Sequence, residues 1–260
     1  MNYVGRTGTT IARNLDAGIL SGLVAGDIAA IWCSGFVPDD DCRRTVERVL
    51  AGDFATHEDQ TSVRTLGVPL GLLLSGAVTE TDYKLGLDSF LRDWEFDRPA
   101  VPDYVAQLQT TIERCGLNFI EASWRGLVFA PFVVRIYQPA ARLRPHIDRS
   151  MEAPIRHLCG AARLSANIYL HGSGPDSGAL ELWDLSMPSA SFDEIEGMPE
   201  RLQRERLGPP SVVIHPNTGD CIIFDAERIH AVSAVKSGCR VTCSSFMGID
   251  AGRRSFTLFA

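Results

Sequence analysis

The second half of this 260-residue sequence is a series of short apolar runs separated by turn-forming residues. The runs are rich in Val, Ile and Phe, which favour strands, and occur at 127–137, 162–170, 178–183, 211–214, 221–224, 230–235, 240–247 and 255–259. Gly, Pro, Asn and Asp stand between them, as at 217–220. So many short strands, joined by turns, predict a double-stranded β-helix, or jelly roll, built from two sheets.

The first 120 residues have a different character, because apolar residues recur there at helical spacing. We expect helices at 16–24, 38–50, 79–91 and 102–116 and a strand at 27–32. Residues 63–74 could form one or two strands or a packed loop. The fold class is therefore α+β dominated by β structure, with helices of residues 1–120 buttressing the sheet of a jelly-roll core at 121–260.

No internal repeat or flexible linker divides the sequence, so residues 1–260 are predicted to form a single domain. The polar, helix-prone segment 186–208 interrupts the strands of the second half. A connection of this length in a compact domain favours a functional role. We predict that it folds over the site as a lid.

Composition narrows the class of function. The net charge of −7 and the pI near 5.4 argue against a nucleic-acid partner. The seven cysteines are irregularly spaced and include no Cys-x-x-Cys pair, which argues against a disulfide framework or zinc ribbon and favours a reducing cytoplasm. No apolar run is long enough to cross a membrane, and residues 1–16 do not resemble a signal peptide. We expect a cytoplasmic protein without a membrane partner, and a homodimer stays open.

The strongest chemical signal is the segment 144–148, which reads Arg-Pro-His-Ile-Asp. Side chains two residues apart in a strand point to the same face, so His146 and Asp148 could hold one metal ion. With a third ligand from His230, they would form the two-histidine, one-carboxylate set of non-haem Fe(II) centres. Three protein ligands leave positions open for a co-substrate and O₂.

The surroundings of His230 strengthen this interpretation. A Gly-Asp turn at 219–220 and an apolar strand precede His230, and Arg240 follows ten residues later (240 − 230), with Thr242 beyond it. Chance alone could produce a His-x-Asp pair among six histidines, but the full combination is harder to produce by chance.

Together these residues resemble the Fe(II)/2-oxoglutarate-dependent dioxygenase superfamily, in the style of its prolyl-hydroxylase-like branch, over roughly residues 124–250. The resemblance implies that His146, Asp148 and His230 bind Fe(II) inside a double-stranded β-helix. It also implies that Arg240 binds the distal carboxylate of 2-oxoglutarate, which a planar guanidinium can hold through two hydrogen bonds. A plain salt bridge is the alternative for Arg240.

Three further residues match family positions near the co-substrate. Tyr169 matches a tyrosine that hydrogen-bonds 2-oxoglutarate, Tyr137 matches another site tyrosine, and Thr242 could share the carboxylate with Arg240. Ordinary packing in the core is the alternative for all three. Arg144 and Arg149 flank the metal motif and could bind a substrate carboxylate, or they could be surface arginines.

The reaction implied by the resemblance is oxidative. The cofactors would be Fe(II), 2-oxoglutarate and O₂, and the products succinate, CO₂ and a hydroxylated substrate. In the family's halogenases a Gly or Ala replaces the carboxylate, so Asp148 favours hydroxylation, with desaturation and cyclisation left open. We expect a small molecule, an amino acid or a derivative of one. The alternatives are a hydroxylase of a protein side chain, of prolyl type, a metalloenzyme that uses no 2-oxoglutarate, and a non-enzymatic jelly-roll metal-binding protein.

Overall fold

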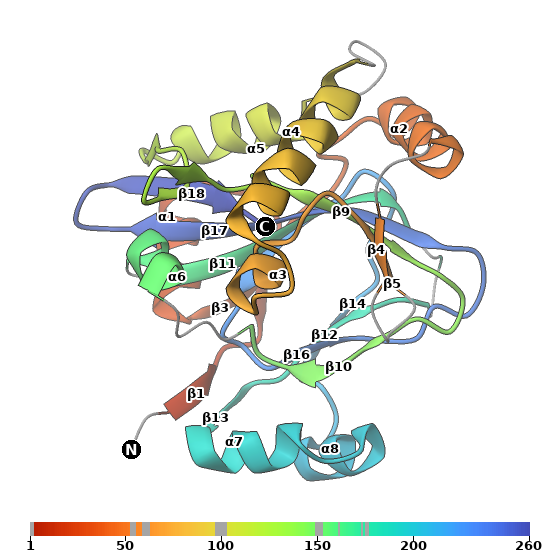
Figure 1. Ribbon diagram of the computed structural model, residues 1–260. Helices are drawn as coiled ribbons and strands as arrows, with labels where there is room; N and C mark the ends of the chain where they lie inside the picture. The colour runs from red at the N-terminus through yellow and green to blue at the C-terminus, as the bar shows by residue number, and fades with distance from the viewer. Residues whose placement is uncertain are drawn as a thin grey trace.

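The computed structural model describes residues 3–52, 56–58, 63–96, 103–148, 153–160, 162–172, 174 and 177–260. Within them, two mainly antiparallel sheets of unequal size pack against each other, and helices cover the outer face of the larger one (Figure 1). No helix among these residues is long and apolar enough to cross a membrane.

The larger sheet has strands from both halves of the chain. In spatial order the strands of its main path are β2 (Thr10–Ala12), β3 (Ile28–Cys33), β15 (Cys221–Asp225), β11 (Ala162–His171), β17 (Arg240–Asp250), β9 (Val133–Tyr137), β5 (Val63–Leu66) and β4 (Thr56–Glu58). Off this path, β18 (Ser255–Phe259) pairs with β17 and with β6 (Asn118–Phe119). The pairs β2–β3 and β6–β18 are parallel, and the other pairs are antiparallel.

The smaller sheet has the spatial order β10 (Leu143–His146), β16 (His230–Val232), β12 (Leu180–Leu182) and β14 (Val212–Ile214). Leu180, Leu182 and Ile214 pack against Tyr169 and Phe224 of the larger sheet, which joins the two layers. Two short pairs complete the strands of the described residues, namely β1 (Tyr3–Arg6) with β13 (Leu185–Pro188) and β7 (Ser123–Trp124) with β8 (Leu127–Val128).

The helices are α1 (Ala17–Ala25), α2 (Asp39–Ala51), α3 (Leu70–Leu74), α4 (Glu80–Phe96), α5 (Tyr104–Glu113), α6 (Ala153–Cys159), α7 (Ser189–Glu196) and α8 (Glu200–Leu207). Buried side chains of α1, α2, α4 and α5, such as Leu23, Val49, Trp94 and Leu108, pack on one face of the larger sheet. The smaller sheet lies on its other face (Figure 1).

Strand β11 shows how the sequence makes this layering. Leu164, Ala166 and Ile168 belong to the core beneath the helices. The alternate residues of a strand point to the opposite face, so the polar side chains at 163, 165, 167 and 169 face the smaller sheet. A polar row thus lies between the two sheets, where the candidate site is found.

Three segments differ from the sequence-based expectation. Residues 70–74 form helix α3, which begins directly after Pro69, a residue whose ring favours the first turn of a helix. The predicted strand at 127–137 is broken into β8 and β9 around Pro131, which cannot donate a backbone hydrogen bond. Helix α6 lies in a stretch between two expected strands to which no element was assigned.

The segment 186–208 supplies the end of β13 and helices α7 and α8, which pack on the outer face of the smaller sheet (Figure 1). Arg204 of α8 forms an ion pair with Glu181 of β12 at 2.8 Å. Phe192 and Leu207 pack with Ile147, Ile229 and Ala231 beneath strand β16. Closure of this segment over the site stays a prediction.

Candidate metal centre and co-substrate site

Two neighbouring strands and the turn that follows one of them bring the three candidate metal ligands together. His146, the last residue of β10, lies directly opposite His230, the first residue of β16. The Nε2 atom of His146 is 3.6 Å from one carboxylate oxygen of Asp148, and Nε2 of His230 is 3.3 Å from the other. One ligand atom from each of the three residues falls within 4.8 Å of the others.

Both histidines are oriented by a hydrogen bond to the backbone two residues earlier. Nδ1 of His146 lies 2.7 Å from the carbonyl oxygen of Arg144, and Nδ1 of His230 lies 2.8 Å from that of Arg228. Since a carbonyl can only accept, each Nδ1 carries the proton and each Nε2 keeps a free lone pair. This is the tautomer in which a histidine binds a metal through Nε2.

Asp148 is placed by a turn rather than by the strand. Strand β10 ends at His146, and the backbone N–H of Asp148 donates to the carbonyl oxygen of Ala226 at 2.9 Å. The apolar side chain between the two ligands, Ile147, is buried in the cluster beneath the smaller sheet. Strand alternation alone therefore does not explain why both ligands face one point.

The charges of the candidate metal ligands influence one another's pKa values. Burial, followed by the neighbouring charge of His230, lowers the pKa of His146 to about 4, so its imidazole is neutral near pH 7. Burial acts to raise the pKa of Asp148, but His230, His146 and Arg135 outweigh it and hold that pKa below its usual range. Two imidazole nitrogens and one carboxylate fit a divalent iron and leave coordination positions free.

Arg240 lines a narrow cavity of about 30 Å³, which His146, Asp148 and His230 also line. The residue is 3% exposed, and its Nε and Nη1 atoms are buried without a hydrogen-bond partner. Its Nη2 donates to the hydroxyl oxygen of Tyr169 at 3.2 Å. A buried guanidinium with free donors is costly unless an anion accompanies it, so this cavity fits a carboxylate.

Tyr169 and Tyr137 both lie against this guanidinium. The Cζ atom of Arg240 is 4.7 Å from the ring centroid of Tyr137 and 4.9 Å from that of Tyr169. Burial raises the pKa of Tyr169, which keeps its hydroxyl protonated. Because this oxygen accepts from Arg240, its own hydrogen remains available to a bound carboxylate.

Thr242 lies between these groups and a row of polar side chains. It pairs with Tyr169 on one side and with Arg135 on the other, and its hydroxyl is 3.1 Å from that of Ser244. Ser244 in turn donates to Oδ1 of Asn167 at 2.7 Å. Thr242 is thus linked through Ser244 to Asn167, which lines the narrow cavity, but Thr242 is not itself among the lining residues, and its contact with the co-substrate stays a prediction.

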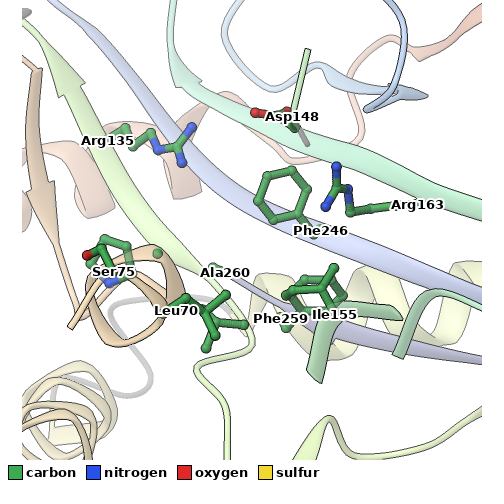
Figure 2. Close-up of a pocket in the computed structure, with 12 residues that line it drawn as sticks. Leu70, Ser75, Arg135, Asp148, Ile155, Arg163, Phe246, Phe259 and Ala260 are labelled. Carbon is green, nitrogen blue, oxygen red and sulfur yellow. The ribbon is translucent and has the colours of Figure 1, made fainter. Parts of the chain in front are cut away.

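A larger cavity of about 340 Å³ adjoins the metal centre and shares Asp148 and Arg135 with the narrow one (Figure 2). Its other lining residues are Pro69, Leu70, Gly71, Leu74, Ser75, Ile155, Arg163, Phe246, Phe259 and Ala260. Sequence reasoning missed Arg135 and Arg163, the one arginine in each of strands β9 and β11. Alternation along a strand predicts the face on which each of them lies, but not their burial or their lack of an ion-pair partner.

Arg144, one of the two arginines proposed from the motif, is exposed and does not line either cavity. Its backbone carbonyl orients His146, but a role of its side chain in substrate binding stays a prediction. Arg149 lies outside the described residues.

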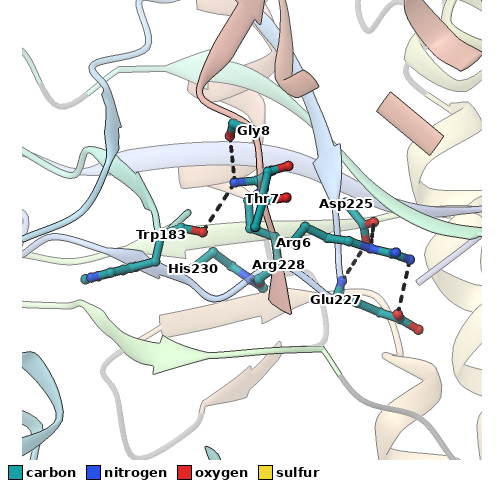
Figure 3. A network of polar contacts seen from close by, with 8 residues as sticks. All are labelled: Arg6, Thr7, Gly8, Trp183, Asp225, Glu227, Arg228 and His230. Carbon is teal, nitrogen blue, oxygen red and sulfur yellow. Dashed lines mark hydrogen bonds and ion pairs between the residues drawn. The ribbon is translucent and has the colours of Figure 1, made fainter. Parts of the chain in front are cut away.

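A network beneath His230 fixes the strand that carries it (Figure 3). Arg228 is 0% exposed and donates to the carbonyl oxygens of Gly8, Trp183 and Thr7 at 3.0, 3.3 and 3.3 Å. Arg6 forms an ion pair with Asp225 at 2.8 Å. The N-terminal segment is thereby tied to the turn that leads into His230.

The sequence was compared with known families and structures. Residues 132–248, which include the His-Asp-His group and Arg240, match the model of the 2OG-Fe(II) oxygenase superfamily. This part of the chain, which carries the candidate site, matches the superfamily's sequence pattern. The protein is an Fe(II)/2-oxoglutarate-dependent dioxygenase, and its cofactors are Fe(II), 2-oxoglutarate and O₂.

Solved structures share the oxygenase's fold at low sequence identity. An N-substituted L-amino acid dioxygenase from Burkholderia ambifaria AMMD is 19% identical, with a TM-score of 0.63 over 99% of this chain and 97% of that chain. The same enzyme in complex with alpha-KG is 18% identical, with a TM-score of 0.58 over the same shares of the two chains. No protein with a curated description matches the sequence significantly.

Proposed function

We propose that this oxygenase hydroxylates an unactivated C–H bond of a small amino-acid-derived molecule, converting 2-oxoglutarate and O₂ to succinate and CO₂. The observation that carries the proposal is the 340 Å³ cavity, which reaches Asp148 and is bounded by Leu70, Ile155 and Phe259. Its volume is within the range of small-molecule sites. A substrate held there would have a C–H bond next to the metal centre.

In this proposal His146, Asp148 and His230 hold Fe(II), which with 2-oxoglutarate and O₂ supplies the oxidising power when bound. Arg240 binds the distal carboxylate of 2-oxoglutarate, and the hydroxyl of Tyr169 donates to the same carboxylate. Their support is the pair of free guanidinium donors and the free hydroxyl hydrogen in the narrow cavity. The ring of Tyr137 lies against the guanidinium of Arg240, and the hydroxyl of Thr242 orients that of Ser244.

We further propose that the two sheets form a double-stranded β-helix and that the whole chain is one domain. The packing of strands from residues 10–33 into the same sheet as β11 and β17 supports this arrangement. The helix-rich part buttresses the core, since its buried side chains and those of the larger sheet form one cluster.

The choice of an amino-acid derivative is supported by the Burkholderia dioxygenase, which acts on N-substituted L-amino acids and shares the fold along nearly the whole chain. It is also supported by the two arginines in the cavity wall, which could attract a carboxylate. Hydroxylation of a protein side chain remains the competing outcome in the test below.

The test is a substrate screen under air with Fe(II) and 2-oxoglutarate. Free amino acids, N-acylated amino acids and proline-containing peptides are compared by succinate release and by the mass of the product. We expect stoichiometric succinate and a mass gain of one oxygen atom, derived from ¹⁸O₂, with at least one small molecule. Succinate release with peptides alone would contradict the proposal.

A further inference from the structure

Arg163 is a buried cation that lines the larger cavity. The residue is 7% exposed, its Nε atom is buried without a hydrogen-bond partner, and it forms no ion pair within the part of the chain that the structure describes. One described neighbour is the ring of Phe246, whose centroid lies 5.6 Å from Cζ, and Arg163 also lines a smaller pocket with Cys159 and Glu227. A contact at that distance compensates only weakly for the lost hydration of a guanidinium.

Arg135 faces the same cavity from strand β9. It is half-buried and close enough to Asp148 to lower the pKa of that carboxyl, yet the two do not form an ion pair in the described structure. Figure 2 shows the two guanidinium groups on either side of Phe246, with Asp148 nearby. Two cations thus face one cavity whose lining has a single acidic side chain, and that carboxylate points to the histidines.

The co-substrate does not account for Arg163. Arg163 and Tyr169 are six residues apart on one extended strand (169 − 163), which corresponds to about 20 Å. A five-carbon diacid whose distal carboxylate lies at Arg240 and Tyr169 cannot reach that far. The co-substrate therefore does not supply a partner for the buried Nε of Arg163.

We propose that Arg163, assisted by Arg135, binds a carboxylate of the substrate, so that the enzyme acts on a small carboxylic acid with an apolar body. We call Arg163 and Arg135 together the carboxylate clamp. The apolar part of the substrate would lie against Leu70, Ile155 and Phe259, between this clamp and the metal centre. This inference rests on the proposed function and specifies the substrate class. Arg163 binds and positions the substrate. The C–H bond that reacts is the one that lies nearest to the metal centre at Asp148 when the carboxylate is bound.

The test measures binding rather than turnover. The anaerobic protein with Fe(II) and 2-oxoglutarate is titrated calorimetrically with N-acetyl derivatives of leucine, isoleucine, methionine and phenylalanine, and with the matching carboxamides. We expect at least one acid to bind, and its amide to bind roughly 10- to 100-fold more weakly, because an amide cannot accept a charge-assisted pair of hydrogen bonds.

Variants then assign the effect to a residue. Arg163→Gln should weaken binding of the acid by about 10- to 100-fold and leave the amide unchanged, while Arg163→Lys should restore part of the affinity. The matched control is Arg201→Gln in helix α8, whose side chain is 84% exposed, and it should change neither constant. Thermal unfolding of each variant, with and without 2-oxoglutarate, checks that the fold is kept.

Three results would overturn the inference. These are the absence of binding by every acid, equal binding of acid and amide, and an Arg163→Gln variant that loses affinity for 2-oxoglutarate instead. Failure of the proposed function is seen separately in the substrate screen, where peptides alone would then release succinate. If a neutral small molecule is turned over and the complex with Fe(II) and 2-oxoglutarate forms normally, the role of Arg163 is refuted while the proposed function is supported.

Discussion

At the scale of single residues, the metal centre depends on how its imidazoles are held. His146 and His230 each use Nδ1 to donate to a carbonyl two residues earlier, and each directs Nε2 at Asp148. The two rings lie 4.2 Å apart between centroids. The protein's own hydrogen bonds thus orient these donor atoms, which lowers the ordering cost of metal binding.

Replacing His146 with Ala should remove Fe(II) binding. Changes to residues that only support a ligand cost about 10- to 100-fold in metal affinity, so loss of a ligand should cost more. Anaerobic calorimetry with Fe(II) measures the effect. The control is His171→Ala, an exposed histidine outside the site, and equal affinities in the two variants would contradict the assignment.

Replacing Arg240 with Gln should weaken 2-oxoglutarate binding by about 10- to 100-fold, because two charge-assisted hydrogen bonds are lost. The unfolding midpoint measures this directly, since a ligand that binds only the folded protein raises it. We expect 2-oxoglutarate with Fe(II) to raise the midpoint of the wild type more than that of the variant. Fe(II) affinity without 2-oxoglutarate should stay the same, and its loss would indicate a structural role instead.

At the scale of secondary-structure elements, the segment 186–208 supports the ligands from behind. Its Phe192 packs with Ile147, which lies between two ligands, and with Ile229, which precedes the third. Helix α8 is tied to the smaller sheet through Arg204 and Glu181, and to Arg142 through Glu200 at 2.6 Å. Movement of this segment would therefore shift the residues that hold the metal ligands in place.

Replacing Phe192 with Ala should destabilise the protein by about 3–5 kcal/mol, because the ring is fully buried. It should also lower Fe(II) affinity, since Ile147 and Ile229 lose a packing partner. Chemical denaturation and metal titration measure the two effects. Leu202→Ala in the same segment, at a side chain that is 39% exposed, should change stability by less than about 0.5 kcal/mol.

The local sequence pattern was enough to predict many helices and strands, but not which elements pack or pair with one another. Val, Ile and Phe runs indicated β11, β15 and β17, and Asp16 indicated the start of α1. The ligand spacing singled out His146, Asp148 and His230, which the structure brings within reach of one ion. Arg163 was missed because its significance lies in what is absent around it, and burial without a partner cannot be read from neighbours in sequence.

At the scale of the whole molecule, the N-terminal segment joins the layers. Strand β1 pairs with β13, and β2 extends the larger sheet beside β3. Between them, the carbonyl oxygens of Thr7 and Gly8 accept hydrogen bonds from Arg228 (Figure 3). One buried side chain thus links the start of the chain to the turn before His230, more than 200 residues later (230 − 8 = 222).

Replacing Arg228 with Met should leave several buried carbonyl groups without donors and cost about 1–3 kcal/mol of unfolding free energy. Because the carbonyl of Arg228 also orients His230, Fe(II) affinity should fall by roughly 10- to 100-fold. Denaturation and metal titration are again the measurements. Arg253→Met, at a side chain that is 72% exposed, is the control and should change neither quantity.

The central claim is that one site binds Fe(II) and 2-oxoglutarate together. Anaerobic titration of the purified protein with both tests it most directly, by the weak visible charge-transfer band of the chelate between metal and co-substrate. We predict that the band appears only when both are present, saturates at one equivalent of Fe(II) and is lost in His146→Ala. A folded protein that binds Fe(II) but never shows the band at saturating 2-oxoglutarate would contradict the account.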